Sequence, residues 1–222
     1  MTCSASETPA GRPAIFARLV IATGNANKVR EIVSILDGAP VQVAAIDTFP
    51  PIAEPEEHGA TFAEIARAKA LYYAGATGAV VVAEDSGLEV DALSGAPGIH
   101  SARYGGDTAT TYEAKFALIY DQMRQRGVST SSARFVCALA VAIPGRVVFE
   151  AHGTIEGEIA PSPRGSGGFG YDPIFYYPPM GCTLAEVPAD RKSEVSHRGK
   201  AFRALRRFID QHGLPVRRGE AS

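Results

Sequence analysis

One pair of segments constrains the fold of this chain more than any other feature. Residues 133–143 carry large apolar side chains at every second position, with smaller or polar side chains between them. Pro144 and Gly145 then mark a turn, and residues 147–155 return with a strand-like composition. Because side chains alternate between the two faces of a strand, this pattern predicts a long β-hairpin. The strands of a hairpin are antiparallel, so a sheet that contains them is not purely parallel.

The other segments alternate between short apolar runs and helical stripes. Thr61 and Thr110 each precede a glutamate by three residues, a spacing typical of a capped helix start, and Ser196 is a natural N-cap. Strands that alternate with helices, together with the hairpin, predict an α/β fold around a mixed sheet. We expect strands near residues 19–22, 41–44, 80–83, 88–90 and 174–177, and helices near residues 27–36, 61–74, 110–127 and 196–212.

The composition fits an ordinary globular protein, and the length allows one large domain or two small lobes. Of the 222 residues, 45% are apolar and 21% are charged, close to the usage of ordinary globular proteins, which excludes collagen, coiled coil and a wholly disordered chain. The N-terminal stretch lacks the apolar core of a signal peptide, and we expect residues 1–16 to be a disordered leader. The folded domain is expected over residues 17–213 and a tail over residues 214–222.

Charge and cysteine content limit the partners. The net charge is −2, whereas proteins that coat nucleic acid or bind anionic membranes are usually basic. No apolar run approaches the roughly 20 residues of a membrane helix. We therefore predict binding to neither nucleic acid nor membrane. Cys3, Cys137 and Cys182 cannot all pair and do not have metal-finger spacing, which favours a reducing cytoplasm.

The segment TGNANK, residues 23–28, follows one predicted strand and opens a predicted helix. Gly24 permits a tight turn, the backbone amides of a helix start favour an anion, and Lys28 adds a positive charge. The glycine and lysine spacing differs from that of a P-loop. A phosphate-binding loop and an ordinary turn capped by an asparagine explain this segment equally well.

Glu84 and Asp85 directly follow the apolar run 80–83. Two carboxylates at the end of a strand suit a hard divalent cation such as Mg²⁺. The alternative is an Asp-Ser-Gly turn, and if the strand continues, only one of the two carboxylates can face a given site. Glu56 and Glu57, in a proline-rich acidic loop, offer either a further ligand or a solvated charged surface.

Two later segments have features of a base-binding site. In residues 166–173, glycines let the backbone approach a ligand, and Phe169 or Tyr171 can stack on a base, although a flexible loop that ends at a core aromatic is an alternative. The segment KSEVSHR places His197 and Arg198 in the first turn of a helix, where the helix dipole disfavours each cation by about 0.3–1 kcal/mol. This placement predicts a bound anion or an electron-rich partner, and a solvated basic turn is the alternative.

Four segments together carry a resemblance that none carries alone: TGNANK, AEDSGLEVDALSGAPGIHSARYGG, GFGYDPIF and RKSEVSHRGKA, in this order. Over residues 19–209 the chain resembles the inosine triphosphate pyrophosphatase family, hydrolases of noncanonical purine nucleoside triphosphates. The resemblance implies an elongated single α/β domain with two lobes around a long twisted mixed sheet and the active cleft between the lobes. It also implies a homodimer that converts ITP, dITP or XTP to the monophosphate and pyrophosphate with Mg²⁺, which cleanses the nucleotide pool.

The resemblance further implies residue roles. Asp85 is expected to hold Mg²⁺ together with Glu56 and to accept a proton, while Phe169 stacks on the base. The sequence departs from the family at Glu84, where many members have a second aspartate, and at Ile65, where some have asparagine. The substrate contacts implied by the resemblance are Thr23, Gly24, Asn25, Ala26, Asn27, Lys28, Lys69, Ser86, Phe169, Gly170, Tyr171, Asp172, Lys192, His197 and Arg198.

Three alternatives stay open. The chain could be a pyrophosphatase for another base, such as a modified pyrimidine, or a metal-dependent phosphatase that releases orthophosphate. It could also be an inactive nucleotide-binding protein on the same fold, although the retained Lys28, Glu56, Asp85 and Lys192 argue against this. The identity of the product separates the phosphatase from the expected reaction.

Overall fold

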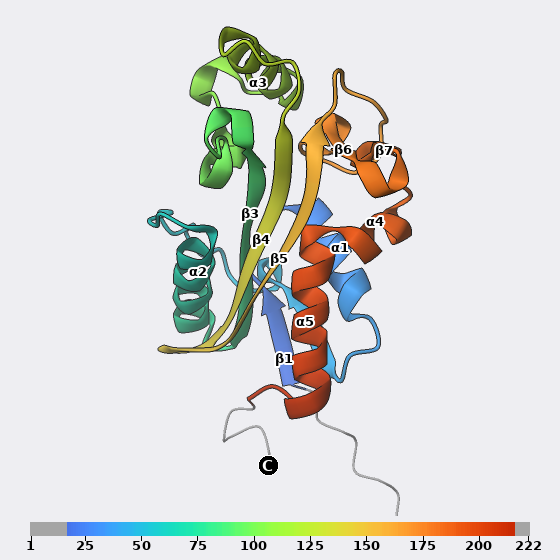
Figure 1. The fold of residues 1–222 in the computed structure, drawn as a ribbon. Coiled ribbons are helices and arrows are strands. Elements are labelled where there is room, and N and C mark those ends of the chain that lie inside the picture. Colours follow the sequence, from blue (N-terminus) through green and yellow to red (C-terminus); the bar gives the residue numbers. More distant parts are fainter. Residues whose placement is uncertain (1–16, 216–222) are drawn as a thin grey trace, which may run out of the picture.

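The computed structural model describes residues 17–215 and is built on one seven-stranded sheet (Figure 1). The strand order is β2-β1-β3-β4-β5-β6-β7, in which β1 is parallel to β2 and β3 and all later neighbours are antiparallel. This confirms the predicted mixed sheet. The strands are β1 (Ala17–Ile21), β2 (Val41–Ala45), β3 (Val80–Val90), β4 (Ser132–Ile143), β5 (Arg146–Ile159), β6 (Phe175–Tyr177) and β7 (Cys182–Thr183).

The predicted hairpin is the longest part of the sheet. Strands β4 and β5 have 12 and 14 residues, and their pairing runs from Ile143 opposite Arg146 to Ser132 opposite Glu158. Together with β3 they extend along the length of the molecule and give it an elongated shape (Figure 1). They connect a lower lobe, which contains β1, β2, α1, α2 and α5, to an upper lobe, which contains α3, β6 and β7.

Helices cover both faces of the lower sheet, with α2 on one side and α5 on the other (Figure 1). No helix in the described range 17–215 is long and apolar enough to cross a membrane. The helices are α1 (Ala26–Leu36), α2 (Phe62–Thr77), α3 (Tyr112–Gln125), α4 (Ala189–Val195) and α5 (His197–His212); two short 3₁₀ helices, η3 (Gly98–Arg103) and η5 (Asp172–Ile174), matter for the site.

The alternating pattern of β4 separates two cores in the lower lobe. Its larger side chains pack with α1 and α5, and its alanines pack with α2, which contributes alanines of its own. Small side chains on both surfaces allow α2 and the sheet to approach closely. The first group is Cys137, Leu139 and Val141; the second is Ala138, Ala140 and Ala142, facing Ala66, Ala70 and Ala74.

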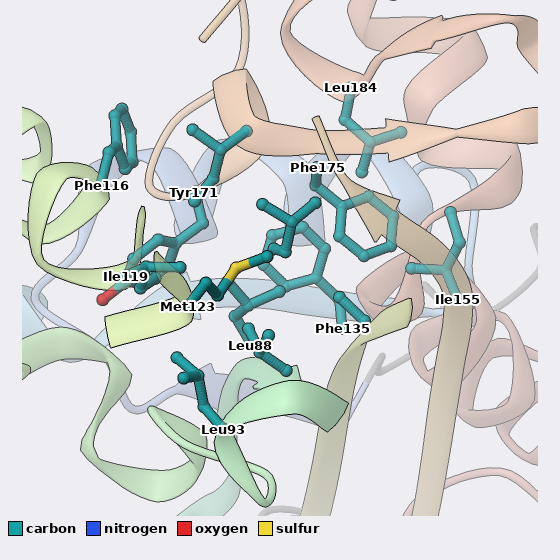
Figure 2. Close-up of a cluster of buried hydrophobic side chains, with 14 of the residues drawn as sticks. Leu88, Leu93, Phe116, Ile119, Met123, Phe135, Ile155, Tyr171, Phe175 and Leu184 are labelled. Carbon is teal, nitrogen blue, oxygen red and sulfur yellow. The ribbon is translucent and has the colours of Figure 1, made fainter. Parts of the chain in front are cut away.

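A third core supports the upper lobe. Figure 2 shows Leu88 of β3, Phe135 of β4 and Phe175 of β6 packed around Met123 of α3. The rings of Phe135 and Phe175 are 4.6 Å apart between centroids. Tyr171 belongs to the same core, so the glycine-rich segment before η5 is anchored in packed side chains rather than being a free loop.

The predicted break between residues 83 and 88 is wrong. Strand β3 continues through Glu84, Asp85, Ser86 and Gly87, and each pairs with a residue of β4. The residues that resemble a turn stay extended because the long partner strand supplies ladder hydrogen bonds along the whole segment. The two carboxylates therefore lie in mid-strand, and neither a turn nor a strand end is present.

Helix boundaries were also shifted by the tertiary structure. Helix α2 passes through Gly75 and ends at Gly78, whose φ of 64° is the left-handed conformation that glycine adopts readily. The predicted cap of α3 at Thr110 is wrong, since Thr111 accepts the hydrogen bond from the Ala114 amide. The apolar stripe expected for the helix near residues 27–36 includes Val33, but Val33 is 45% exposed.

Some elements lack a clear sequence signal. Strand β7 and helix α4 are short and were not predicted. Leu214, expected in the tail, packs into the lower core. The expected leader over residues 1–16 and the tail beyond Pro215 lie outside the described residues, so the domain limits stay predictions.

Candidate active site

The TGNANK segment connects β1 to α1, as predicted. Asn25 caps the helix, because its side-chain oxygen accepts hydrogen bonds from the amides of Asn27 (3.0 Å) and Lys28 (3.3 Å). Thr23 accepts a hydrogen bond from the Asn25 amide. Ala26 and Asn27 form the first helical turn, and Asn27 turns its side chain towards Arg30. The loop thus presents a helix N-terminus with an adjacent lysine, which favours a bound anion.

Glu84 lies on the face of β3 that packs against α5. Its carboxylate is 2.7 Å from Lys28 Nζ and 3.4 Å from Arg198 Nη2, and it is fully enclosed. Burial by itself raises the pKa of Glu84, but Lys28 and Arg198 outweigh burial and hold this pKa well below its usual range. Glu84 therefore stays ionised and serves to hold these two cations.

Asp85 points to the opposite face, as expected for a continuous strand. Its nearest cation is Lys69 of α2, with an Nζ to Oδ1 distance of 3.7 Å. Burial raises the pKa of Asp85 to about 6, although Lys69 opposes this shift, and Glu84 adds to it. The other oxygen, Oδ2, is buried without a hydrogen-bond partner among residues 17–215. Asp85 is thus the less neutralised of the two neighbouring carboxylates.

The acidic loop contributes Glu57 rather than Glu56. The carboxylate of Glu57 contacts Lys69 and lies 2.5 Å from Arg103 Nη1. Burial raises the pKa of Glu57, but hydrogen bonds from Lys69 and Arg103 more than offset it, so its pKa is lowered. Glu56, in contrast, is 86% exposed in its side chain and contacts His58 at 2.9 Å. The expected pairing of Glu56 with Asp85 is therefore not formed in this structure.

The residues around Asp85 fit a hard cation. The buried Oδ2 of Asp85 lacks a hydrogen-bond partner among the described residues. The carboxylate of Glu57 contacts Lys69, the same lysine that lies near Asp85. Oxygen ligands of this kind suit Mg²⁺. Within the described part of the chain, no three histidine, cysteine or acidic side chains gather closely enough to enclose a metal. Water or a bound phosphate has to complete the coordination, as is usual for Mg²⁺.

The KSEVSHR segment meets the FGYD segment around Lys192 and Asp172. Lys192 Nζ lies 2.5 Å from Asp172 Oδ2 and 3.1 Å from Glu31 Oε1. Asp172 also accepts a hydrogen bond from the Phe169 amide at 2.7 Å. Burial raises the pKa of Asp172, and Lys192 opposes the shift. Gly168, with φ of 66°, has to be glycine here because a Cβ would collide with the Asp172 carboxylate.

Arg198 is almost completely enclosed and joins three elements. It donates hydrogen bonds to Glu31 of α1 (2.6 Å) and to Ser86 of β3 (3.0 Å), and it contacts Glu84. These internal carboxylates explain the cation at the start of α5, where the sequence predicted an anion or an electron-rich partner. Arg198 Nε stays without a partner in the part of the chain that the structure describes.

His197 is the exception among the expected cations. Its ring stacks on Phe135 with centroids 4.8 Å apart, and it is buried. Burial lowers the pKa of His197 well below its usual value, and the nearby Arg198 lowers it further, so the ring is neutral. Its Nδ1 has no hydrogen-bond partner among the described residues. The prediction of a cation at this position is therefore wrong, and a neutral polar group takes its place.

These side chains line two adjoining cavities. The inner cavity, of about 380 Å³, is lined by Phe169–Asp172, Lys192, His197 and Arg198. The carboxylates and cations that line the outer cavity, of about 520 Å³, include Glu56, Glu57, Glu84, Lys69 and Arg103. Thr23, Gly24, Lys28, Glu54 and Ala102 line both, so the TGNANK loop stands between them.

Several lining residues were missed by the sequence analysis. Tyr112 of α3 lies edge-to-face on Tyr171 at 5.3 Å, and Phe135 of β4 supports His197. Ser101, Ala102 and Arg103 come from η3. The quoted segment GIHSARYGG contains the η3 residues but gives no reason to select one of them, and Tyr112 reads as the start of a helical stripe.

The model of the Ham1 family matches residues 19–208, and this range includes every residue of both cavities named above. The chain belongs to the Ham1 family. A relative from Geobacter sulfurreducens, named dITP/XTP pyrophosphatase, is 44% identical over 197 residues, which cover 89% of this chain and 98% of the relative.

Solved structures of this family have the same fold. A HAM1 protein from Coxiella burnetii is 36% identical, with a TM-score of 0.81 over 88% of this chain and 100% of that chain. The Ham1 protein of Staphylococcus aureus is also 36% identical, with a TM-score of 0.77 over 87% of this chain and 98% of that chain. Family membership thus confirms the resemblance found in the sequence.

Proposed function

We propose that the chain hydrolyses noncanonical purine nucleoside triphosphates, namely ITP, dITP and XTP, to the monophosphate and pyrophosphate. The observation that carries this proposal is the pair of cavities that share the TGNANK loop. One cavity offers buried polar groups for a base, and the other offers cations for phosphates. The names of relatives such as the Geobacter sulfurreducens dITP/XTP pyrophosphatase support the substrate class. This activity removes such nucleotides before they enter DNA or RNA.

The phosphates are bound by backbone and lysine charges. The N-terminus of α1 faces the shared part of the cavities and holds the phosphate next to the nucleoside. Lys28 and Lys69 add two cations from different elements, and both are already oriented by carboxylates. A triphosphate carries about four negative charges at neutral pH, so it competes well for these lysines against single carboxylates.

Asp85 is proposed as the proton acceptor and as a ligand of Mg²⁺. Its pKa of about 6 leaves it mostly ionised at neutral pH but still basic enough to take a proton from water. Glu84 is a poorer base, because Lys28 and Arg198 hold it ionised. Pyrophosphate leaves, so water attacks the α-phosphorus. A bound Mg²⁺ would neutralise phosphate charge and lower the pKa of a water molecule that it binds.

For the second carboxylate ligand we favour Glu57 over Glu56. Glu57 already lies on Lys69 beside Asp85, whereas Glu56 faces solvent. Glu56 also lines the outer cavity, but its carboxylate contacts His58 rather than Lys69. The sequence expectation thus shifts by one residue along the loop.

Base selection is assigned to the enclosed side chains of the inner cavity. Hypoxanthine and xanthine have a 6-oxo acceptor, where adenine has a 6-amino donor. Arg198 Nε is a buried donor without a partner, so a 6-oxo group satisfies it and a 6-amino group does not. Each buried polar group left unpaired costs about 1–3 kcal/mol, which corresponds to about tenfold to hundredfold discrimination.

The proposal extends to the oligomeric state and the cellular compartment. We propose a cytoplasmic homodimer, in keeping with the resemblance to the family. Cys137 and Cys182 are free thiols, which fits a reducing compartment. Light scattering of the purified chain measures its mass in solution, and a monomer contradicts the dimer.

The deciding experiment is hydrolysis of ITP, XTP, GTP and ATP with Mg²⁺, with pyrophosphate and orthophosphate measured separately. We expect pyrophosphate from ITP and XTP and little from ATP. Orthophosphate as the product instead indicates a phosphatase. No product from any of the four directs the search to modified pyrimidine triphosphates or to a binding role.

A further inference from the structure

Helix α4 carries Lys192 but is too short to hold itself in place. It has seven residues, and Pro188 at its start supplies no side-chain cap. A helix of this length gains little stability of its own, so its position depends on tertiary contacts. The last four carbonyls of a helix lack partners within it, so the end of α4 needs donors from other elements. Whatever holds this end also places Lys192.

Arg203 of α5 supplies these donors. Its Nη1 donates to the Ser193 carbonyl at 2.7 Å, and its Nη2 donates to the Glu194 carbonyl at 2.6 Å. A planar guanidinium can meet two successive carbonyls at once, which a lysine ammonium does less well. Gly199, one turn earlier on α5, has no room for a Cβ because the Ser193 carbonyl lies against it. The end of α4 is therefore fixed against the upper end of α5 (Figure 1).

Lys192 directly precedes the first of these two carbonyls and reaches into the inner cavity. Its side chain is 4% exposed, and its Nζ contacts Asp172 and Glu31 and lies 4.8 Å from the centre of the Phe169 ring. An enclosed cation tolerates little displacement, because breaking a buried ion pair leaves a charge uncompensated. Arg203 itself lines neither cavity in the described part of the chain. Its effect on the site therefore passes through the backbone of α4.

We propose that Arg203 is a positioning residue that keeps Lys192 in the inner cavity by holding the end of α4. This inference rests on the proposed function, in which the inner cavity binds the base. Without Arg203, α4 is held less firmly, and Lys192 completes the base site for a smaller fraction of the time. Contacts to the base are made equally in the substrate complex and in the transition state, so their loss raises KM and leaves kcat unchanged.

Arg206 provides a matched control on the same helix. Like Arg203 it is half-buried and donates to two successive carbonyls, those of Asp37 (2.5 Å) and Gly38 (3.0 Å). Its additional pair with Asp210 lies at the surface and contributes little. The two carbonyls follow the end of α1 that lies away from the TGNANK loop. R206Q thus removes similar hydrogen bonds at a place remote from both cavities.

The first part of the test measures kcat and KM for ITP in wild type, R203Q, R203K and R206Q. We expect R203Q to raise KM about fivefold, as the loss of about one hydrogen bond would do, and to keep kcat within about twofold. R203K is expected to recover part of the rise in KM, because its ammonium can still donate to one carbonyl. The KM of R206Q is expected to equal that of wild type.

The second part follows Lys192 directly and needs no nucleotide. The folded proteins are acetylated with acetic anhydride, and peptide mass spectrometry gives the rate at each lysine. A buried lysine reacts when its segment opens locally, so we expect Lys192 to react about fivefold faster in R203Q than in wild type or R206Q. Lys28, which lies on α1, is the internal reference and is expected to react at the same rate in all of these proteins.

Several results would overturn the inference. They are an unchanged KM in R203Q, an equal rise in R206Q, a fall of kcat beyond about twofold, and a rise in KM without faster acetylation of Lys192. The proposed function stands in each of these cases if wild type releases pyrophosphate from ITP. Wild type that releases none overturns both proposals.

Discussion

The two cavities use charge in different ways. In the inner cavity, Lys192 and Arg198 are almost fully enclosed and already paired with Asp172, Glu31 and Glu84. In the outer cavity the cations Lys69 and Arg103 are more exposed than these two. Both contact Glu57, and Lys69 also lies near Asp85, one of whose oxygens has no partner among the described residues. Enclosed pairs are costly to break, so they fix geometry; exposed pairs exchange readily. The inner cavity is thus suited to selection and the outer cavity to transient phosphate binding.

The largest expected effect tests the carboxylate of Asp85, which lies 3.7 Å from Lys69 of the outer cavity. Asp85→Asn removes the proton acceptor and one proposed Mg²⁺ ligand, so we expect pyrophosphate release from ITP to fall by at least about a hundredfold. Thermal unfolding of the variant without nucleotide serves as the control for folding. Activity above a tenth of wild type would show that the assignment of Asp85 is wrong.

The next effect concerns selection in the inner cavity. Arg198→Ala removes the donor assigned to the 6-oxo group, so the ratio of kcat/KM for ITP over ATP is expected to narrow by about tenfold to hundredfold. Arg207→Ala, an exposed change on the same helix, is the control and keeps the wild-type ratio. An unchanged ratio in Arg198→Ala places base reading elsewhere.

Two substitutions in the acidic loop test which glutamate of the outer cavity is the Mg²⁺ ligand. Glu57→Gln is expected to raise the Mg²⁺ concentration for half-maximal activity by about tenfold, since it weakens an oxygen ligand beside Asp85. Glu56→Gln is expected to change it by less than about twofold, because Glu56 faces solvent. The reverse order of the two effects would restore Glu56 as the ligand.

The smallest effect is a pH dependence of stability from the inner cavity. Burial depresses the pKa of His197, so below the ordinary histidine pKa near 6.5 the unfolded chain binds a proton that the folded protein does not. The free energy of unfolding therefore falls as pH decreases from 6.5, by about 1.4 kcal/mol per pH unit for one such group. Chemical unfolding of wild type and His197→Gln between pH 7.5 and 5.5 measures this difference. Parallel curves for the two proteins would mean that His197 is not the titrating group.

Local patterns predicted most of the framework. The hairpin follows from alternation at residues 133–155, and Asn25, Thr61 and Ser196 cap their helices as their short polar side chains suggest. Such features depend on neighbours within a few residues. Predictions from such features failed where pairing with a distant strand determined the conformation, as in the extended segment from Glu84 to Gly87.

The sequence motifs predicted candidate site residues, but they did not predict the contacts among them. The motifs identified Lys28, Asp85, Lys192 and Arg198, yet no local pattern points to Glu31, which holds both Lys192 and Arg198. Glu31 lies 167 residues before Arg198 in the chain, so only the packing of α1 beside α5 brings them together.

The sequence by itself determined most of the strand and helix segments, the mixed sheet and the family. These properties depend on residue order and on local backbone preferences. The tertiary structure decided which cations each of the two neighbouring carboxylates meets, that Glu57 rather than Glu56 meets Lys69, and that His197 is neutral. Each of these depends on burial and on charges from distant segments, because the strength of an ionic interaction is set by the surrounding medium and by distance in space.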